Sequence, residues 1–118
     1  MKGRPFPARI CVAAAGVGEA WRGEASFRTQ AVFAVLAAVV TLALRPGLVW
    51  AAIVAVAVAL VLAFEMINSA LEAVIDHLHP DAADPIRRAK DMAAGAVLLA
   101  SAGAAIAGVL MVASVALG

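Results

Sequence analysis

The chain has 118 residues, of which 65% are apolar and only 14% are charged. Soluble domains are about half apolar and about a quarter charged, and a chain this short has too much surface to hide such a composition from water. The formal net charge of +1 favours no nucleic-acid partner. The composition therefore excludes a water-soluble globular fold and indicates a small all-α membrane protein that forms one domain, residues 1–118.

The first predicted element is an amphipathic helix over residues 8–23. Small apolar residues alternate there with charged ones such as Arg22, and Trp21 is placed to lie at the headgroup level of a membrane surface. Residues 1–5 include the basic residues Lys2 and Arg4, but no long apolar run follows them directly. We therefore expect the N-terminus to be retained and not cleaved as a signal peptide.

The first predicted transmembrane segment covers residues 24–44. Residues 31–44 carry no charge, but this run alone is too short to span a bilayer. A helix that begins near Glu24 reaches about 20 residues and is long enough. Pro46 and Gly47 then end the helix, because proline cannot continue it and glycine permits the chain to reverse.

The second predicted transmembrane segment covers residues 48–78. Residues 48–64 are uncharged, with Trp50 as an interfacial anchor. No glycine or proline interrupts the chain before Pro80, so we expect the helix to extend beyond the membrane as far as Leu78.

A turn over residues 79–85 leads to the third predicted segment, residues 86–116. We expect Asp84 to cap this helix and Pro85 to occupy its first turn. From Met92 to the last residue there is no charge, which is ample for a span.

The basic residues predict the orientation of these segments. Eight of the nine Lys and Arg residues precede the uncharged parts of the first and third segments, which three crossings place on one side of the membrane. By the positive-inside rule that side is cytoplasmic. We therefore expect a multi-pass protein of a bacterial inner membrane, with its N-terminus in the cytoplasm and its C-terminus outside.

Polar residues gather where the second segment leaves the membrane. Glu65, Asn68, Glu72 and Asp76 fall within an arc of about 80° and along about 16 Å of one helix face. Carboxylates at the hydrocarbon boundary are costly and usually face a bundle interior, where a stripe of them favours a divalent cation. The alternative is a helix that has left the membrane and shows its polar face to water, which fits Asp76 best.

The other two segments carry polar residues at the same level. Glu24 and Arg28 begin the first segment, and Lys90 and Asp91 precede the third. Carboxylates of this kind suit Mg²⁺ when substrate phosphates complete its coordination, and the cations suit phosphate groups. The alternative for Lys90 is that it only marks topology and attracts lipid headgroups.

Three stretches of the chain resemble motifs of the prokaryotic integral-membrane diacylglycerol kinase family. Residues 65–76, EMINSALEAVID, resemble its E-x-x-N-[ST]-A-[IL]-E-x-x-x-D signature. Residues 88–91, RAKD, resemble [RKA]-A-K-D, and residues 24–28, EASFR, resemble E-x-[AN]-F-R. The motifs follow in the family's order, and the resemblance extends from about Gly16 to the C-terminus.

The resemblance implies a homotrimer whose active sites form between subunits and transfer the γ-phosphoryl group of Mg-ATP to a lipid hydroxyl. It also implies roles for eight side chains. As catalytic groups it indicates Glu65, the base, and Asn68, near the reacting phosphate. As Mg²⁺ and triphosphate ligands it indicates Glu24 and Glu72. As further ATP contacts it indicates Lys90 and Asp91, and as lipid contacts Glu65, Arg28 and Ser69.

The lipid acceptor is open between two members of this family. Motifs 24–28 and 65–76 favour diacylglycerol, which would give phosphatidic acid, whereas residues 93–98 resemble undecaprenol kinases. The sequence also departs from the family's pattern at Val12, where an adenine-contacting tyrosine is common, and at Gln30, where an acidic residue is common.

A function of another class is a non-catalytic membrane subunit or a small transporter component. The carboxylate stripe would then be an ion or proton path. Such a path needs polar steps across the bilayer, and none is present from Met92 onward.

Overall fold

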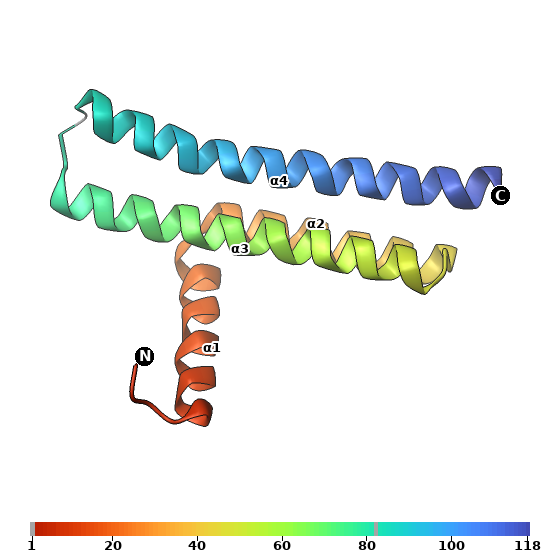
Figure 1. The fold of residues 1–118 in the computed structure, drawn as a ribbon, viewed down its shortest axis with the longest axis horizontal. Coiled ribbons are helices and arrows are strands. Elements are labelled where there is room, and N and C mark those ends of the chain that lie inside the picture. The colour runs from red at the N-terminus through yellow and green to blue at the C-terminus, as the bar shows by residue number, and fades with distance from the viewer. Residues whose placement is uncertain (1, 82) are drawn as a thin grey trace.

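The computed structural model describes residues 2–81 and 83–118, and this part of the chain is all-helical. Its helices are α1 (Phe6–Gly23), α2 (Ala25–Leu44), α3 (Leu48–Leu78) and α4 (Asp84–Leu117). Helices α2, α3 and α4 run side by side with alternating directions, whereas α1 leaves the side of this bundle (Figure 1). The three bundle helices are long and apolar enough to cross a membrane. The predicted all-α membrane fold with a preceding helix is therefore confirmed.

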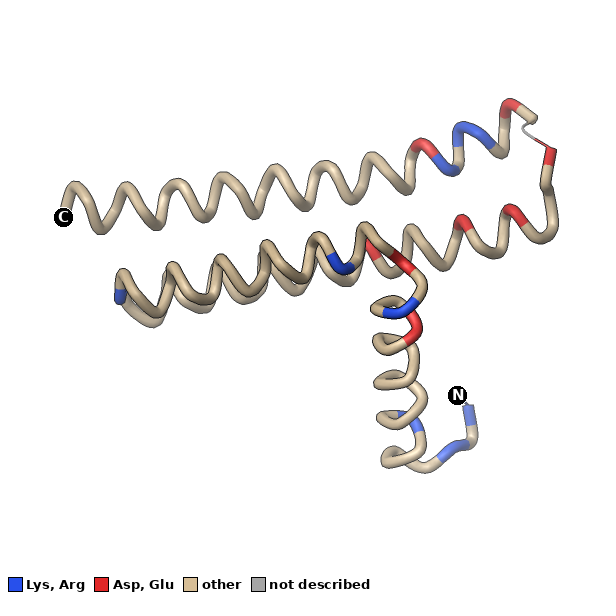
Figure 2. The backbone as a smooth tube through the Cα atoms, turned by 180° about the vertical axis from the view of Figure 1, so that it is seen from behind, with Lys and Arg blue, Asp and Glu red and all other residues tan. Residues whose placement is uncertain are grey.

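The three bundle helices differ in length, and the excess lies at one end. Helix α2 has 20 residues, which at 1.5 Å per residue matches a hydrocarbon core of about 30 Å. Helices α3 and α4 have 31 and 34 residues, or about 46 and 51 Å. Their acidic residues, Glu65, Glu72, Asp76, Asp84 and Asp91, lie in the half of the bundle next to the α3–α4 loop, which we call the polar end (Figure 2).

Helix α3 is the centre of the bundle, since it packs along α4 and also against α2. Val54, Val61, Glu65 and Ser69 are its buried residues, spaced so that they lie on one helix face. Helices α2 and α4 meet much less, and Thr41 Oγ1 lies 3.6 Å from the sulfur of Met111 far from the polar end.

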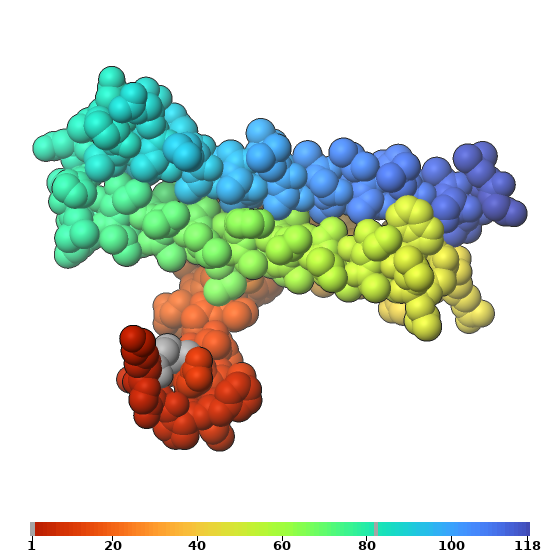
Figure 3. All heavy atoms as spheres, viewed as in Figure 1, coloured from red at the N-terminus to blue at the C-terminus, as the bar shows by residue number. Residues whose placement is uncertain are grey.

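The outer faces of the bundle remain apolar and exposed. Val35 on α2, Val56 on α3 and Leu99 on α4 are each at least 60% exposed. In the space-filling view α3 and α4 lie against each other along their length, while α1 projects from the side of the bundle and meets only α2 and α3 among the described residues (Figure 3). Faces of this composition fit a hydrocarbon environment, because lipid tails are as apolar as these side chains.

The turn between α2 and α3 depends on two residues with positive φ. Arg45 caps α2 in the left-handed conformation, with φ 49°, and its N–H donates to the carbonyl of Thr41. Gly47 follows with φ 104°, a region that residues with a Cβ rarely adopt. The predicted reversal at Pro46 and Gly47 is thus made by the backbone freedom of Gly47 together with the left-handed cap at Arg45.

The prediction that Asp84 caps α4 is wrong. The capping residue is Ala83, with φ −61° and ψ 147°, and no side chain of the described residues caps this helix end. Asp84 is already helical, and its carboxylate lies 3.9 Å from Nε of Arg87. An acidic side chain in the first turn still interacts favourably with the helix dipole, so the residue type suits the position although its role differs.

Candidate functional site

Glu65 is the most deeply placed carboxylate of the polar end. It follows the uncharged run of α3, and only 5% of its surface is exposed because it lies on the face that packs against the other helices. Ser69, one turn later, is 8% exposed. An ionisable side chain inside a membrane bundle is costly, and it usually indicates a functional site.

Asn68 lies between these two residues and has an unsatisfied oxygen. Its Oδ1 atom is buried and has no hydrogen-bond partner among the residues that the structure describes. A buried acceptor left in this state costs about 1–3 kcal/mol. The structure thus places an available amide oxygen beside Glu65, which suits a group that binds a ligand.

Glu24 forms the corner between α1 and α2. It is the one residue between these helices, with extended backbone at φ −122° and ψ 106°. Its N–H donates to the carbonyl of Ala20, and its own carbonyl accepts from the N–H of Arg28. The backbone of Glu24 is therefore fixed at the start of the first span, and its side chain is half-buried there.

The Arg28 side chain closes the same corner. Its Nη1 atom donates to the backbone oxygens of Trp21, at 2.7 Å, and Arg22, at 3.3 Å. These carbonyls lie in the last turn of α1, where no backbone N–H of the helix donates to them. Arg28 thus has a structural function that the sequence did not predict, and its predicted contact with lipid stays a prediction.

Lys90 on α4 is bonded across the bundle to α3. Its Nζ atom donates to Oδ1 of Asp76 at 2.7 Å, and its side chain is 34% exposed. Lys90 precedes the uncharged run of α4 that begins at Met92. The hydrogen bond to Asp76 raises the pKa of Lys90, desolvation opposes this, and the negative charges of Asp76 and Glu72 add to the increase.

Asp91 is paired within α4. Its Oδ2 atom accepts a hydrogen bond of 2.9 Å from Nη1 of Arg87. In the sequence Arg87 is one of the basic residues that precede the uncharged part of the third segment, and Asp76 fits best a helix face exposed to water. The ion pairs of Arg87 with Asp91 and of Asp76 with Lys90 show that both residues set the charge distribution of the polar end. The place of Asp76 on the carboxylate stripe of α3 is the sequence signal that could indicate its pairing.

The acidic residues do not form a preassembled metal centre. Within residues 2–81 and 83–118, no three acidic, histidine or cysteine side chains come close enough to hold a metal ion. Glu24 and Glu72 are both half-buried carboxylates, and Asn68 adds an unpartnered oxygen. Oxygen donors in this small number suit Mg²⁺, which uses one or two carboxylates and completes its coordination with phosphate and water.

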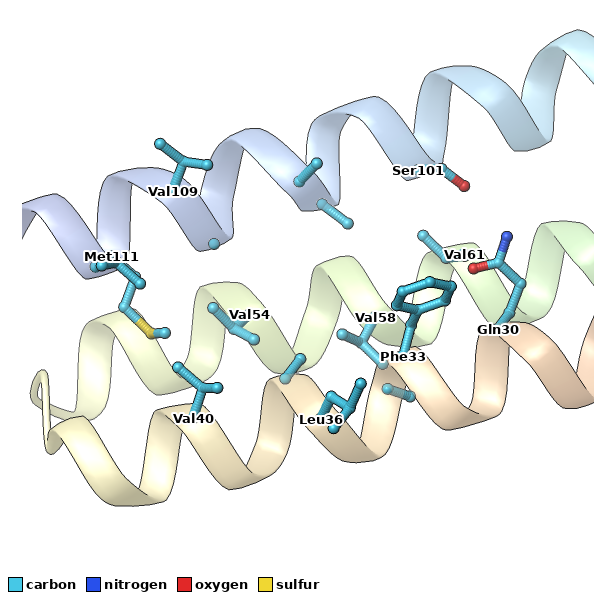
Figure 4. A pocket seen from close by; sticks show the side chains of 16 residues that line it. Gln30, Phe33, Leu36, Val40, Val54, Val58, Val61, Ser101, Val109 and Met111 are labelled. Atoms are coloured by element: carbon cyan, nitrogen blue, oxygen red, sulfur yellow. The ribbon is translucent and has the colours of Figure 1, made fainter.

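An apolar groove of about 700 Å³ runs between α2 and α4, with residues of α3 as its floor. Val40, Val54 and Met111 lie toward one end, and Gln30 and Ser101 lie at the other (Figure 4). Val61 also lines the groove, and Glu65 follows it by one helical turn, or about 6 Å. The groove therefore leads from the apolar part of the bundle toward the level of Glu65.

Comparison with known proteins identifies the family. The sequence profile described as "Prokaryotic diacylglycerol kinase" matches residues 11–112. The chain belongs to this family. The diacylglycerol kinases of Escherichia coli strain K12 and of Shigella flexneri are each 38% identical to it over 85 residues, which cover 72% of this chain and 70% of the relative.

Family membership decides the broad function. The chain is a multi-pass membrane protein and a lipid kinase, so the predicted family and enzyme class are confirmed. The matched segment contains all three motifs, residues 24–28, 65–76 and 88–91. The roles of the individual side chains stay predictions.

Proposed function

We propose that this kinase transfers the γ-phosphoryl group of Mg-ATP to the hydroxyl of diacylglycerol, giving phosphatidic acid. The observation that carries the proposal is the buried carboxylate of Glu65 at the end of an uncharged span. Asn68, three residues later, has a buried oxygen with no hydrogen-bond partner in the described part of the chain. A base at this depth can meet a lipid hydroxyl that stays near the membrane surface.

Phosphoryl transfer requires mainly positioning and charge neutralisation. Glu65 accepts the proton of the lipid hydroxyl, and Asn68 orients the phosphoryl group beside it. Glu24 and Glu72 would hold Mg²⁺, which neutralises the charge of the triphosphate when it is bound. Lys90 supplies an ammonium group to the phosphates, and Asp91 contributes to nucleotide binding from the same helix.

The groove between α2 and α4 supports access for the lipid. Its lining is almost entirely apolar, so it can receive an acyl chain while the hydroxyl reaches the level of Glu65. Arg28 and Ser69 complete the lipid contacts in this proposal, since Ser69 follows the proposed catalytic residue Asn68 and Arg28 lies four residues after the proposed Mg²⁺ ligand Glu24.

We further propose that the protein is a homotrimer of the bacterial inner membrane, with its N-terminus in the cytoplasm. The polar end then faces cytoplasmic ATP. The described residues of one chain contain no cluster of acidic side chains that could hold a metal ion. Sites shared between subunits would bring carboxylates from two chains together. Eight of the nine basic residues at one membrane side support the orientation.

Undecaprenol is the second candidate acceptor. It also presents a terminal hydroxyl at the membrane surface, so the same base and nucleotide contacts would serve it. The 38% identity to diacylglycerol kinases favours diacylglycerol.

The decisive experiment is transfer of labelled phosphate from ATP to dioleoylglycerol or undecaprenol in mixed micelles with and without Mg²⁺. We expect labelled phosphatidic acid from the wild type only when Mg²⁺ is present. Glu65→Gln, shown to be folded by its thermal melting curve, should transfer at least about a hundredfold less.

Each other outcome has a definite meaning. Exclusive labelling of undecaprenol would replace the acceptor and keep the mechanism. Wild-type activity in Glu65→Gln would remove the base from the proposal. Folded wild-type protein that labels neither lipid would contradict the proposed reaction.

A further inference from the structure

The ion pair between Asp76 and Lys90 differs from the other ion pairs of the described chain. It joins two helices, whereas Arg22–Glu19, Arg87–Asp84 and Arg87–Asp91 each lie within one helix. Its N–O distance is 2.7 Å, and Lys90 is the least exposed of all the paired side chains, at 34%. Asp76 is exposed and only Lys90 is half-buried, so what distinguishes this pair is that it fixes a lysine of α4 against α3.

The pair fixes where the Lys90 ammonium lies. A lysine ammonium sits on a flexible four-carbon stem and has no preferred direction of its own. Here Asp76 draws it from α4 to the carboxylate face of α3, one helical turn beyond Glu72. Glu72 precedes Asp76 by four residues on the same face of α3, and its negative charge adds to the increase in the pKa of Lys90.

We propose that Asp76 is a positioning residue, which holds the Lys90 ammonium over the carboxylate face of α3 where the Mg-triphosphate group binds. The inference rests on the proposed function, because it requires that Lys90 and Glu72 contact the nucleotide. Asp76 itself contacts no substrate. It reduces the conformational freedom that Lys90 would otherwise lose when the phosphates bind.

The test measures three parameters of the Asp76→Asn variant and of the wild type: the KM for Mg-ATP, kcat and the KM for dioleoylglycerol. We expect the KM for Mg-ATP to rise roughly three- to tenfold, with the other two parameters within about twofold of wild type. Asp76→Glu should recover most of the affinity, because it retains the charge. Asp81→Asn is the matched control, since it removes one negative charge from the exposed α3–α4 loop.

A charge exchange separates positioning from simple linkage of α3 to α4. The double variant Asp76→Lys, Lys90→Asp should restore the melting temperature lost in Asp76→Asn. It should not restore the KM for Mg-ATP, because the ammonium then extends from the wrong helix. Equilibrium binding of a non-hydrolysable Mg-ATP analogue should follow the same order as KM.

Two results would overturn the inference. One is an unchanged KM for Mg-ATP in folded Asp76→Asn while the wild type is active. The other is a wild-type KM in the exchanged pair, which would make the contact purely structural. Failure of the wild type to phosphorylate either lipid would instead overturn the proposed function.

Discussion

Polar side chains inside the bundle are few, and each has a cost that packing must offset. Glu65 and Ser69 are the buried polar residues of the described chain, and Asn68 and Ser101 each have a buried oxygen without a partner. Apolar residues at these positions would pack without unsatisfied groups. The arrangement is understandable if stability has been given up for a site that binds ligands.

Replacing Asn68 with leucine should separate these two effects. Leu has a similar volume and no unsatisfied oxygen, so the free energy of unfolding should stay unchanged or increase by about 1–2 kcal/mol. Phosphate transfer should fall roughly a hundredfold, because a preorganised polar group near the reacting phosphate is lost. Thermal unfolding in detergent and the labelled-ATP assay measure the two quantities. A fully active Asn68→Leu enzyme would contradict the role assigned to Asn68.

At the scale of the helices, the angle at which α1 leaves the bundle depends on a short connection. One residue, Glu24, separates α1 from α2, and the guanidinium of Arg28 binds the last carbonyls of α1. Phe6, Ile10 and Trp21 are exposed apolar residues of α1 that can contact a membrane surface. The corner at Glu24 sets the direction of α1 and therefore how these residues meet that surface.

Replacing Arg28 with methionine should loosen this corner. The side chain keeps its length but loses its donors, so we expect amide hydrogen exchange in the last two turns of α1 to become about tenfold faster. Exchange in α3 and α4 should not change. Arg28→Lys should protect α1 partly, because an ammonium can still donate to one carbonyl. Equal exchange in wild type and Arg28→Met would show that backbone geometry alone holds α1.

The groove between α2 and α4 gives a second prediction at this scale. Ala105 is an exposed residue of α4 that lines the groove, so Ala105→Phe should fill part of it and raise the KM for the lipid roughly five- to tenfold. The KM for Mg-ATP should stay within about twofold of wild type. Ala102→Phe is the control, because Ala102 is also exposed on α4 but is not among the residues that line the groove. Equal effects of both variants would argue against lipid binding in the groove.

At the scale of the whole molecule, the charge distribution relates the fold to the membrane. The acidic residues of α3 and α4 lie in the half of the bundle next to the loop that joins these helices (Figure 2), and the far end of α4 is uncharged. One basic residue, Arg45, lies in the turn between α2 and α3. A bilayer of ordinary thickness can therefore cover the uncharged lengths and leave the polar end in water.

Cys11 allows this orientation to be measured, because it is the single cysteine of the chain and is exposed on α1. A membrane-impermeant maleimide should label it in inverted inner-membrane vesicles and not in intact spheroplasts. The double variant Cys11→Ser, Gly118→Cys should show the opposite pattern. Labelling of Cys11 from the outside would reverse the proposed orientation.

Much of the fold could be predicted from local features of the sequence. Uncharged runs identified the spans, and Pro46 with Gly47 located the turn, because proline and glycine act on the backbone at their own positions. The cap of α4 could not be predicted in this way. Asp84 is an ordinary capping residue, but the helix begins one residue earlier than its sequence pattern indicates, with Ala83 at the cap position and Asp84 in the first turn.

The sequence by itself determined the membrane class, the three spans, the family and the side chains that share one face of α3. Helical periodicity is a property of one segment, so Glu65, Asn68 and Glu72 could be grouped without knowledge of any other helix. Only the tertiary structure decided that Asp76 binds Lys90, that Arg28 binds the end of α1, and that α2 and α4 leave a groove between them. These contacts depend on which faces of different helices meet, and no periodicity within one helix specifies that pairing.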